Sequence, residues 1–431
     1  MRACIIGAGA AGLCAARHIS VLANWEPVIY ELTGGVGGVW VYHGEDVQEN
    51  GRGWHSSMYQ NLRTNLPKEV MAFPDFPFPP SLPSFIGQRD VKCYLESYAR
   101  HFDILKYVKL HHEVLLVDKS PQSNGPLWLV KTRNLLTHET STDWFDVIIV
   151  CNGHYSHPHI PRLPGSSKFR GTQLHSTVYR VPEHFAKTRI ACLGAGPSGI
   201  DIALDLCTHA DKVYLCHKGQ RIVCPLPANL VQLPFITALT ENGVIVGEGP
   251  NATQVPVDVV MYCTGYEYDF PFLNLESVGL TSDGWRVSPL YQHIVNISHP
   301  SMFFIGLCFI VFPFPFFDTQ LEYIVSILTG KSRLPSRDEM LGWEMRDYER
   351  RKTELQLAHK KSHLLGPMQW PYLEGLAKLG GFKLRVWPVI EKMYHHTRDY
   401  RMRDLLGYHD VNYKVVSEEE FVAVKDGKVI T

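Results

Sequence analysis

The chain has 431 residues, of which 45% are hydrophobic and 20% are charged, as in a globular protein with room for two or three packed units. Its formal net charge is -1 and its isoelectric point lies near 7.1. It therefore lacks both the basic surplus that binds nucleic acid and an acidic tail for a basic partner. We expect small-molecule ligands and no nucleic-acid partner.

The cysteines and the apolar segments bear on the compartment. Ten cysteines occur without a C-x-x-C pair, and apolar, strand-like surroundings predict burial for four of them: Cys4, Cys151, Cys192 and Cys263. No charged and apolar leader with a cleavage site opens the chain. The longest apolar segment, residues 302–317, is interrupted by glycine and proline and falls short of the roughly 20 residues that span a bilayer. We expect a cytoplasmic protein without a membrane anchor, and a core position for this segment.

The first predicted element is a strand that runs into a glycine turn and a helix, since residues 3–12 read ACIIGAGAAG. In a G-x-G-x-x-G turn the first glycine allows the tight bend, the second admits a pyrophosphate and the third lets the helix pack on the strand. Glu31 lies 19 residues after the last glycine, where a carboxylate binds ribose hydroxyls. The predicted dinucleotide contacts are Gly7, Gly9, Ala11, Gly12 and Glu31.

A second segment repeats this pattern, since residues 189–199 read RIACLGAGPSG. The residue 19 positions after its last glycine is Lys218, and Arg221 follows. A cation at this position suits a ribose 2′-phosphate and favours NADP over NAD, although a solvated basic loop is the alternative reading. The predicted contacts are Gly194, Gly196, Pro197, Ser198, Gly199, Lys218 and Arg221.

A further internal repeat indicates how the two units connect. Residues 146–154 read DVIIVCNGH and residues 258–266 read DVVMYCTGY, which predicts that each unit closes with the same strand and glycine turn. We therefore predict an α/β fold with two nested Rossmann-like dinucleotide-binding domains, the second inserted in the first. The FAD-binding domain comprises residues 1–160 and 267–431, with a C-terminal helical region, and the NADPH-binding domain comprises residues 161–266.

Apolar periodicity predicts helices near residues 90–101, 318–328 and 337–360. Residues 73–85 and 312–317 are rich in proline and phenylalanine. Proline lacks the backbone N–H and clashes with the preceding helical turn. We therefore predict loops at both places, around a pocket or the domain seam.

Several motifs resemble the flavin-containing monooxygenase family and together cover residues 1 to about 325. The most specific is FRGTQLHSTVYR at residues 169–180, which is similar to the family's F-x-G-x-x-x-H-x-x-x-[YF] pattern. GGVW at residues 37–40 and CTGY at residues 263–266 are similar to two further family segments. Residues 59–79 resemble the stretch that carries the family's active-site asparagine.

This resemblance implies an enzyme that uses FAD, NADPH and O2. NADPH reduces the flavin, the reduced flavin captures O2 as a C4a-hydroperoxide, and one oxygen atom passes to a nucleophilic nitrogen or sulfur of a small amine or sulfide. The catalytic residue it implies is Asn65, whose alternative reading is a self-bonded turn residue before Pro67. The further FAD contacts it implies are Gly38, Val39, Trp40 and Thr64.

Several functions remain open at this point. Tyr179 and Arg180 stand where related Baeyer–Villiger enzymes carry Trp followed by Pro or Asp, which favours nitrogen or sulfur oxygenation over ketone insertion. An NADPH oxidase and a non-catalytic NADPH sensor of the same fold are two further candidates. A disulfide reductase is disfavoured because no close cysteine pair follows Glu31 or Gly196.

Further expectations concern histidines, one glutamine and assembly. His175 is expected to have a structural or NADPH-positioning role. The cluster His154, His157 and His159 resembles the family's interdomain crossing, and no metal site is expected there. Gln320 is a candidate pocket residue. The chain resembles the soluble insect enzymes of the family and is a possible homo-oligomer.

Overall fold

The structure, a computed structural model, describes residues 1–44, 56–120, 125 and 127–430. Its larger sheet has seven strands in the order β20-β21-β22-β7-β1-β2-β3, and β1 pairs in parallel with β2 and β7. The strands are β1 (Arg2–Ile6), β2 (Glu26–Tyr30), β3 (Val108–Lys109), β7 (Val147–Val150), β20 (Leu290–Tyr291), β21 (Val295–Asn296) and β22 (Met302–Phe304). Strands from residues 2–150 and from residues 290–304 therefore share one sheet.

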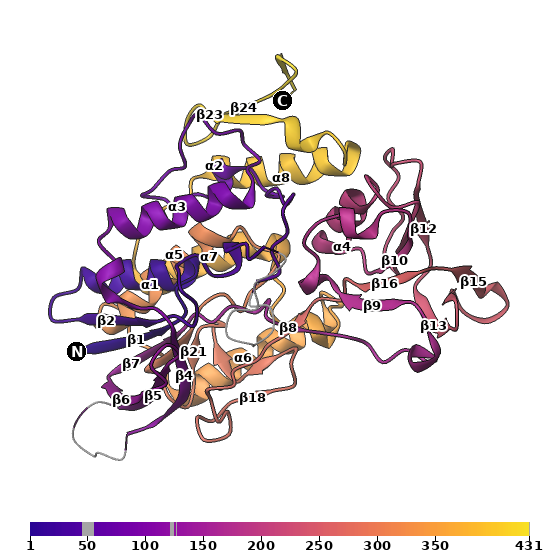
Figure 1. Ribbon diagram of the computed structural model, residues 1–431. Coiled ribbons are helices and arrows are strands. Elements are labelled where there is room, and N and C mark those ends of the chain that lie inside the picture. Colours follow the sequence, from indigo (N-terminus) through magenta and orange to yellow (C-terminus); the bar gives the residue numbers. More distant parts are fainter. Residues whose placement is uncertain (45–55, 121–124, 126, 431) are drawn as a thin grey trace.

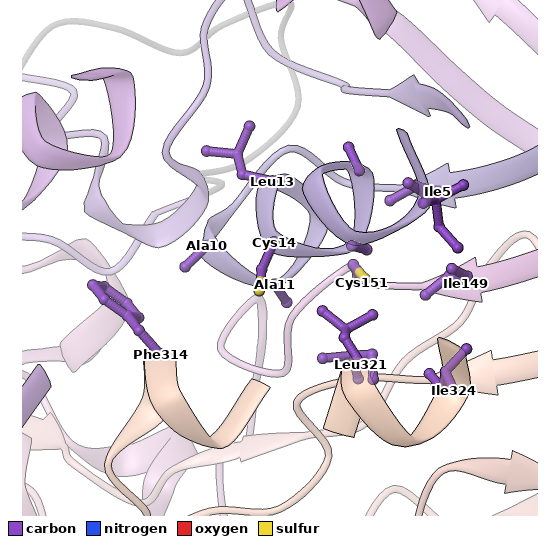
Figure 2. Close-up of a cluster of buried hydrophobic side chains, with 14 of the residues drawn as sticks. Ile5, Ala10, Ala11, Leu13, Cys14, Ile149, Cys151, Phe314, Leu321 and Ile324 are labelled. Carbon is purple, nitrogen blue, oxygen red and sulfur yellow. The ribbon is translucent and has the colours of Figure 1, made fainter. Parts of the chain in front are cut away.

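Both faces of this sheet are buried, which explains why β1 and β2 are apolar after their first residue and β7 and β22 are apolar throughout. Ile5 packs with the helices on one face, while Cys4 packs on the other face against a small antiparallel sheet. Figure 2 shows Ile5 and Ile149 facing Leu321 and Ile324. The helices are α1 (Ala10–Ser20), α2 (Lys68–Met71), α3 (Gln88–His101), α5 (Pro313–Leu328) and α6 (Arg337–Thr353), and the small sheet contains β4 (His112–Lys119), β5 (Trp128–Asn134) and β6 (Thr140–Phe145).

The segment between β7 and β20 builds a second, five-stranded parallel sheet with the order β12-β11-β10-β16-β9 (Figure 1). Its elements are β9 (Thr172–His175), β10 (Arg189–Leu193), α4 (Pro197–Leu206), β11 (Lys212–Cys216), β12 (Leu230–Leu233) and β16 (Val259–Tyr262), with a three-stranded sheet of β13 (Ile236–Thr240), β14 (Gly243–Val246) and β15 (Thr253–Pro256). The crossings into and out of this segment pair with each other as β8 (His157–Pro158) and β17 (Tyr266–Glu267). The predicted α/β class is confirmed.

One loop prediction and one helix prediction need correction. The predicted loop at residues 312–317 is wrong, because α5 begins at Pro313 and includes Pro315 in its first turn. Proline is tolerated there because the first N–H groups of a helix have no partner within it. The helix predicted over residues 337–360 ends at Thr353, where the chain folds back and Arg351 donates to the carbonyl of Leu364 at 2.6 Å. Residues 73–85 form no helix, as predicted.

The C-terminal region, from α7 (Gln369–Gly380) onward, packs against helices of both the seven-stranded and the five-stranded sheet. Its core joins Phe85 and Phe312 to Trp370 and Tyr408, and Ile200 of α4 packs at its edge. Its other elements are α8 (Pro388–Arg403), β23 (Asn412–Val415), β24 (Phe421–Lys425) and β25 (Lys428–Val429), and the remaining hairpin is β18 (Thr281–Ser282) with β19 (Val287–Ser288). Figure 1 shows β23, β24 and the C-terminus above α2 and α3, while α7 lies beside α5.

The predicted burial of the four cysteines is confirmed. Residues 302–308 are buried as predicted, while Ile310 is exposed. Among the helices of the described residues, none has the length and the apolar character that crossing a membrane requires.

Candidate functional site

The first glycine turn joins β1 to α1 and has the geometry that a phosphate cradle requires. Gly7 has φ +101°, and a Cβ there would lie 2.6 Å from the carbonyl oxygen of Cys151. A Cβ on Gly12 would collide with the carbonyl oxygen of Gly7. At Gly9 the nearest atom to such a Cβ is the Cα of Gly38 at 3.5 Å. The first and third glycines are therefore fixed by packing, whereas a Cβ on the second would make only ordinary van der Waals contact with Gly38, at the N-terminus of α1.

The second turn, between β10 and α4, repeats this geometry. Gly194 has φ +114°, and side chains at Gly194 and Gly199 would meet backbone carbonyl oxygens. A Cβ on Gly196 would have no atom within 4 Å. Pro197 occupies the first turn of α4, and Ser198 follows it. Both helix N-termini consequently present open backbone N–H groups to an anion.

The internal repeat corresponds to equivalent hydrogen bonds in the two units. Asp146 accepts the backbone N–H of Arg2 at 2.6 Å, and Asp258 accepts that of Arg189 at 2.9 Å. Each aspartate thus ties its own strand to the first residue of the neighbouring strand, β1 or β10. The guanidinium of Arg189 also bonds Asp258 and holds the pKa of this carboxyl below its ordinary value.

The structure places Glu31 beside the first turn. Its carboxylate accepts the N–H of Ala8 at 2.7 Å and both the N–H and the hydroxyl of Thr33, at 2.8 and 2.7 Å. The residue is only 6% exposed. These bonds fix the carboxylate at the end of β2, next to the glycine turn, with lone pairs remaining for ribose hydroxyls.

In the second unit, Lys218 and Arg221 follow the end of β11 and are exposed. The Lys218 ammonium lies 4.7 Å from the ring centroid of Phe235. The structure therefore places two cations beyond the strand adjacent to β10. A carboxylate occupies the corresponding place in the first unit.

Residues 37–40 cover the first turn from outside. Gly38 has φ +57° and lies so close to Gly9 that a Cβ would be 2.8 Å from the Gly9 Cα. The carbonyl oxygen of Val39 accepts the hydroxyl of Ser56 at 2.6 Å, and Trp40 is half-buried. The tight contact explains why glycine is needed in this segment.

Asn65 lies at a bend just before α2. Thr64 holds the bend because its N–H donates to Ile86 and its hydroxyl accepts from the N–H of the same residue, at 2.9 and 3.2 Å. The half-buried Asn65 amide makes no hydrogen bond with the part of the chain that the structure describes. The alternative reading, a turn residue bonded to its own backbone, therefore does not match the structure.

The histidines singled out in the sequence each have their own partner. His175 donates from Nε2 to the carbonyl of Gly265 at 3.0 Å and accepts the N–H of Thr177 at Nδ1, and burial lowers its pKa to about 4. His154 bonds the carbonyl of Gly306, and burial lowers its pKa to about 4. His159 pairs with Glu267 at 2.6 Å. His159 thus bonds one crossing to the other, whereas His154 and His175 bond other segments, and the three side chains share no partner.

A different group has metal-ligand chemistry, and the sequence analysis missed it. Ligand atoms of Cys14, His18 and Asp318 all lie within 4.8 Å of one another. Arg385, however, donates to both oxygens of Asp318 at 2.7 and 2.8 Å. The guanidinium already neutralises this carboxylate and would repel a cation, so the group is better explained as a buried ion pair joining α1, α5 and the C-terminal region.

Further polar contacts link distant segments. Gln320 is fully buried and donates to the hydroxyl of Tyr372 at 3.1 Å, and its Oε1 has no partner among the residues that the structure describes. The sequence analysis missed Arg63, which donates to the carbonyl of His409 at 2.9 Å. No local pattern marks these contacts, because their partners are distant in sequence. A cavity of about 210 Å³ beside α6 is lined by none of the predicted site residues.

Comparison with known proteins identifies the class. A family model described as flavin-binding monooxygenase-like matches residues 1–226 and 220–393, and the chain belongs to this family. Senecionine N-oxygenase from Tyria jacobaeae is 32% identical over 97% of this chain and 91% of its own. Flavin-containing monooxygenase FMO GS-OX5 from Arabidopsis thaliana is 34% identical over 87% of this chain and 83% of its own.

A solved structure agrees with these relatives. S-allyl-L-cysteine S-oxygenase from Allium sativum superposes with a TM-score of 0.86 and 32% identity, covering 95% of this chain and 94% of that one. The resemblance inferred from the motifs is confirmed. The protein is a flavin-containing monooxygenase, an oxidoreductase that depends on NADPH and O2.

Proposed function

We propose that the protein binds FAD at the first glycine turn and NADPH at the second, and that it transfers one oxygen atom from O2 to a nucleophilic nitrogen or sulfur of a small molecule. The observation that supports the proposal is that the two glycine turns have equivalent geometry but are followed, after the next strand, by side chains of opposite charge. Glu31 follows the first, and Lys218 with Arg221 follows the second.

In this proposal residues 1–160 and 267–431 form the FAD-binding domain, and residues 161–266 form the inserted NADPH-binding domain. The glycine turns at the N-termini of α1 and α4 accept the two pyrophosphates, and Gly196 has open space beside its backbone for this approach. Glu31 holds a ribose of FAD, and the cations beyond β11 hold the 2′-phosphate of NADPH. Lys218 occupies the position that corresponds to Glu31, and a cation there supports NADPH over NADH.

Bound FAD, once reduced, supplies the chemistry that activates O2. The protein supplies binding, orientation and exclusion of water. We assign the catalytic position to Asn65, whose amide has no partner among the described residues and can both donate and accept a hydrogen bond beside the flavin. Gly38, Val39 and Trp40, which cover the first cradle, and Thr64, which holds the bend, complete the proposed FAD site.

The substrate class rests on the relatives, one named for N-oxygenation and another for S-oxygenation. Both chemistries use a soft nucleophile, and we propose the same for this chain. The test is to incubate the FAD-loaded protein with NADPH, isotopically labelled O2, and matched tertiary amines and thioethers. Mass spectrometry should find one labelled oxygen atom in an N-oxide or S-oxide. Consumption of NADPH with formation of H2O2 alone, across the panel, would contradict the proposal and indicate an oxidase.

A further inference from the structure

Helix α4, whose N-terminus carries the second glycine turn, is attached to the rest of the protein by two of its own carboxylates. Asp201 and Asp205 are four residues apart and lie on one side of the helix. Asp205 accepts the amide of Asn61 at 3.0 Å and the hydroxyl of Tyr179 at 2.6 Å. Asn61 belongs to the loop that continues to Asn65. One turn of α4 is therefore bonded to the loop with the proposed catalytic residue.

The other carboxylate is bonded to the C-terminal region. Asp201 accepts Nη2 of Arg401 on α8 at 3.0 Å, and both side chains are 19% exposed. Burial raises the pKa of Asp201, and the Arg401 charge opposes this rise. Because Asp201 is only partly exposed, loss of Arg401 would leave its charge unpaired and incompletely hydrated, which is unfavourable.

Arg401 also contacts a second segment that is bonded to the Asn65 loop. Its guanidinium lies 5.3 Å from the ring centroid of Tyr408, which is 1% exposed. The next residue, His409, accepts a hydrogen bond from Arg63 through its carbonyl oxygen at 2.9 Å. Arg63 directly precedes Thr64 and Asn65. A continuous set of contacts therefore runs from α4 through Arg401 to the bend at Asn65.

We propose that Arg401 is a positioning residue for hydride transfer from NADPH to the flavin. By binding Asp201 and packing on Tyr408, it sets the orientation of α4, and with it the second cradle, relative to the first unit. This inference rests on the proposed function, because it places NADPH at the second cradle and FAD at the first. Hydride transfer is sensitive to such placement, since displacement by about 1 Å can slow a reaction roughly a hundredfold.

The test compares Arg401→Gln with Arg398→Gln, an exposed arginine on the same helix. The rate of flavin reduction at saturating NADPH is measured anaerobically, together with flavin content and NADPH affinity. We expect Arg401→Gln to slow reduction about tenfold with little change in flavin content or affinity, Arg401→Lys to recover part of the rate, and Arg398→Gln to match the unmodified enzyme. Asp201→Asn combined with Arg401→Gln should be less impaired than the sum of the two single effects.

Hydrogen exchange of the protein without added nucleotide gives a readout independent of turnover. Arg401→Gln should increase exchange in residues 59–65 and 197–206 together, and Arg398→Gln in neither. Normal reduction and unchanged exchange in Arg401→Gln would overturn the proposal, as would equal slowing in both variants. If NADPH fails to reduce the unmodified enzyme, the proposed function fails. The exchange result then decides separately whether Arg401 couples the two segments.

Discussion

Glycines at equivalent positions differ in what a side chain would meet. A Cβ at Gly196 would have no neighbour within 4 Å, whereas one at Gly199 would collide with the carbonyl oxygen of Gly194. Gly196→Ala should fold normally but bind NADPH at least about tenfold more weakly, because its methyl group occupies the space proposed for the pyrophosphate. Gly199→Ala should lower stability by about 1 to 3 kcal/mol.

Thermal melting and NADPH titration of these two variants separate folding from binding. Normal NADPH affinity in a folded Gly196→Ala protein would show that the pyrophosphate does not approach this glycine.

The proposed catalytic role of Asn65 can be tested by a single substitution. Asn65→Ser shortens a side chain that has no hydrogen bond to lose among the described residues, so stability and FAD content should not change. Oxygenated product should disappear while NADPH is still oxidised and H2O2 forms, because the amide contact to the flavin is lost. Product analysis against peroxide release checks this. Full product formation by Asn65→Ser would remove the catalytic assignment.

At the scale of elements, α6 begins with a capping box. The hydroxyl of Ser336 accepts the N–H of Glu339, whose carboxylate in turn accepts the N–H of Ser336 at 2.8 Å. Ser336→Ala should destabilise the protein by about 1 kcal/mol, since an N-cap side chain satisfies an N–H group that the helix itself leaves unpaired. Urea unfolding measures the change. Oxygenation should be unaffected, because none of the proposed cofactor contacts lies on α6; a parallel loss of activity would link α6 to the site.

Helix α5 shows how context overrides local pattern. Its sequence begins with two prolines among phenylalanines, which read as a loop. Phe314 and Phe316 are buried in two different clusters, so packing stabilises the helix once proline is confined to its first turn.

For the whole molecule, buried neutral histidines govern stability in mild acid. Burial lowers the pKa of His154 and His175 to about 4 and that of His409 to about 3. In the unfolded chain these groups take up protons as the pH falls through about 6.5. The unfolded state then binds more protons than the folded one, so stability falls between about pH 6.5 and pH 4, by up to roughly 1.4 kcal/mol for each tenfold difference in proton affinity between the two states.

Thermal melting between about pH 7 and pH 5 should show a steadily decreasing midpoint. His175→Gln provides the matched variant. It removes one of these groups, so the melting midpoint should depend less steeply on pH. A midpoint that stays constant or rises on acidification would contradict this account.

The α/β class, the two glycine turns, the equivalence of Asp146 and Asp258, and the family can all be predicted from the amino-acid sequence. These features are local: they follow from backbone sterics and strand periodicity within a few residues, so a short motif records them. Only the folded structure shows what surrounds the bend at Asn65 and which segments hold α4. Arg63 and His409 are 346 residues apart, and Arg401 meets Asp201 across 200 residues. No periodicity encodes such contacts, because they form only when separately folded segments pack against one another.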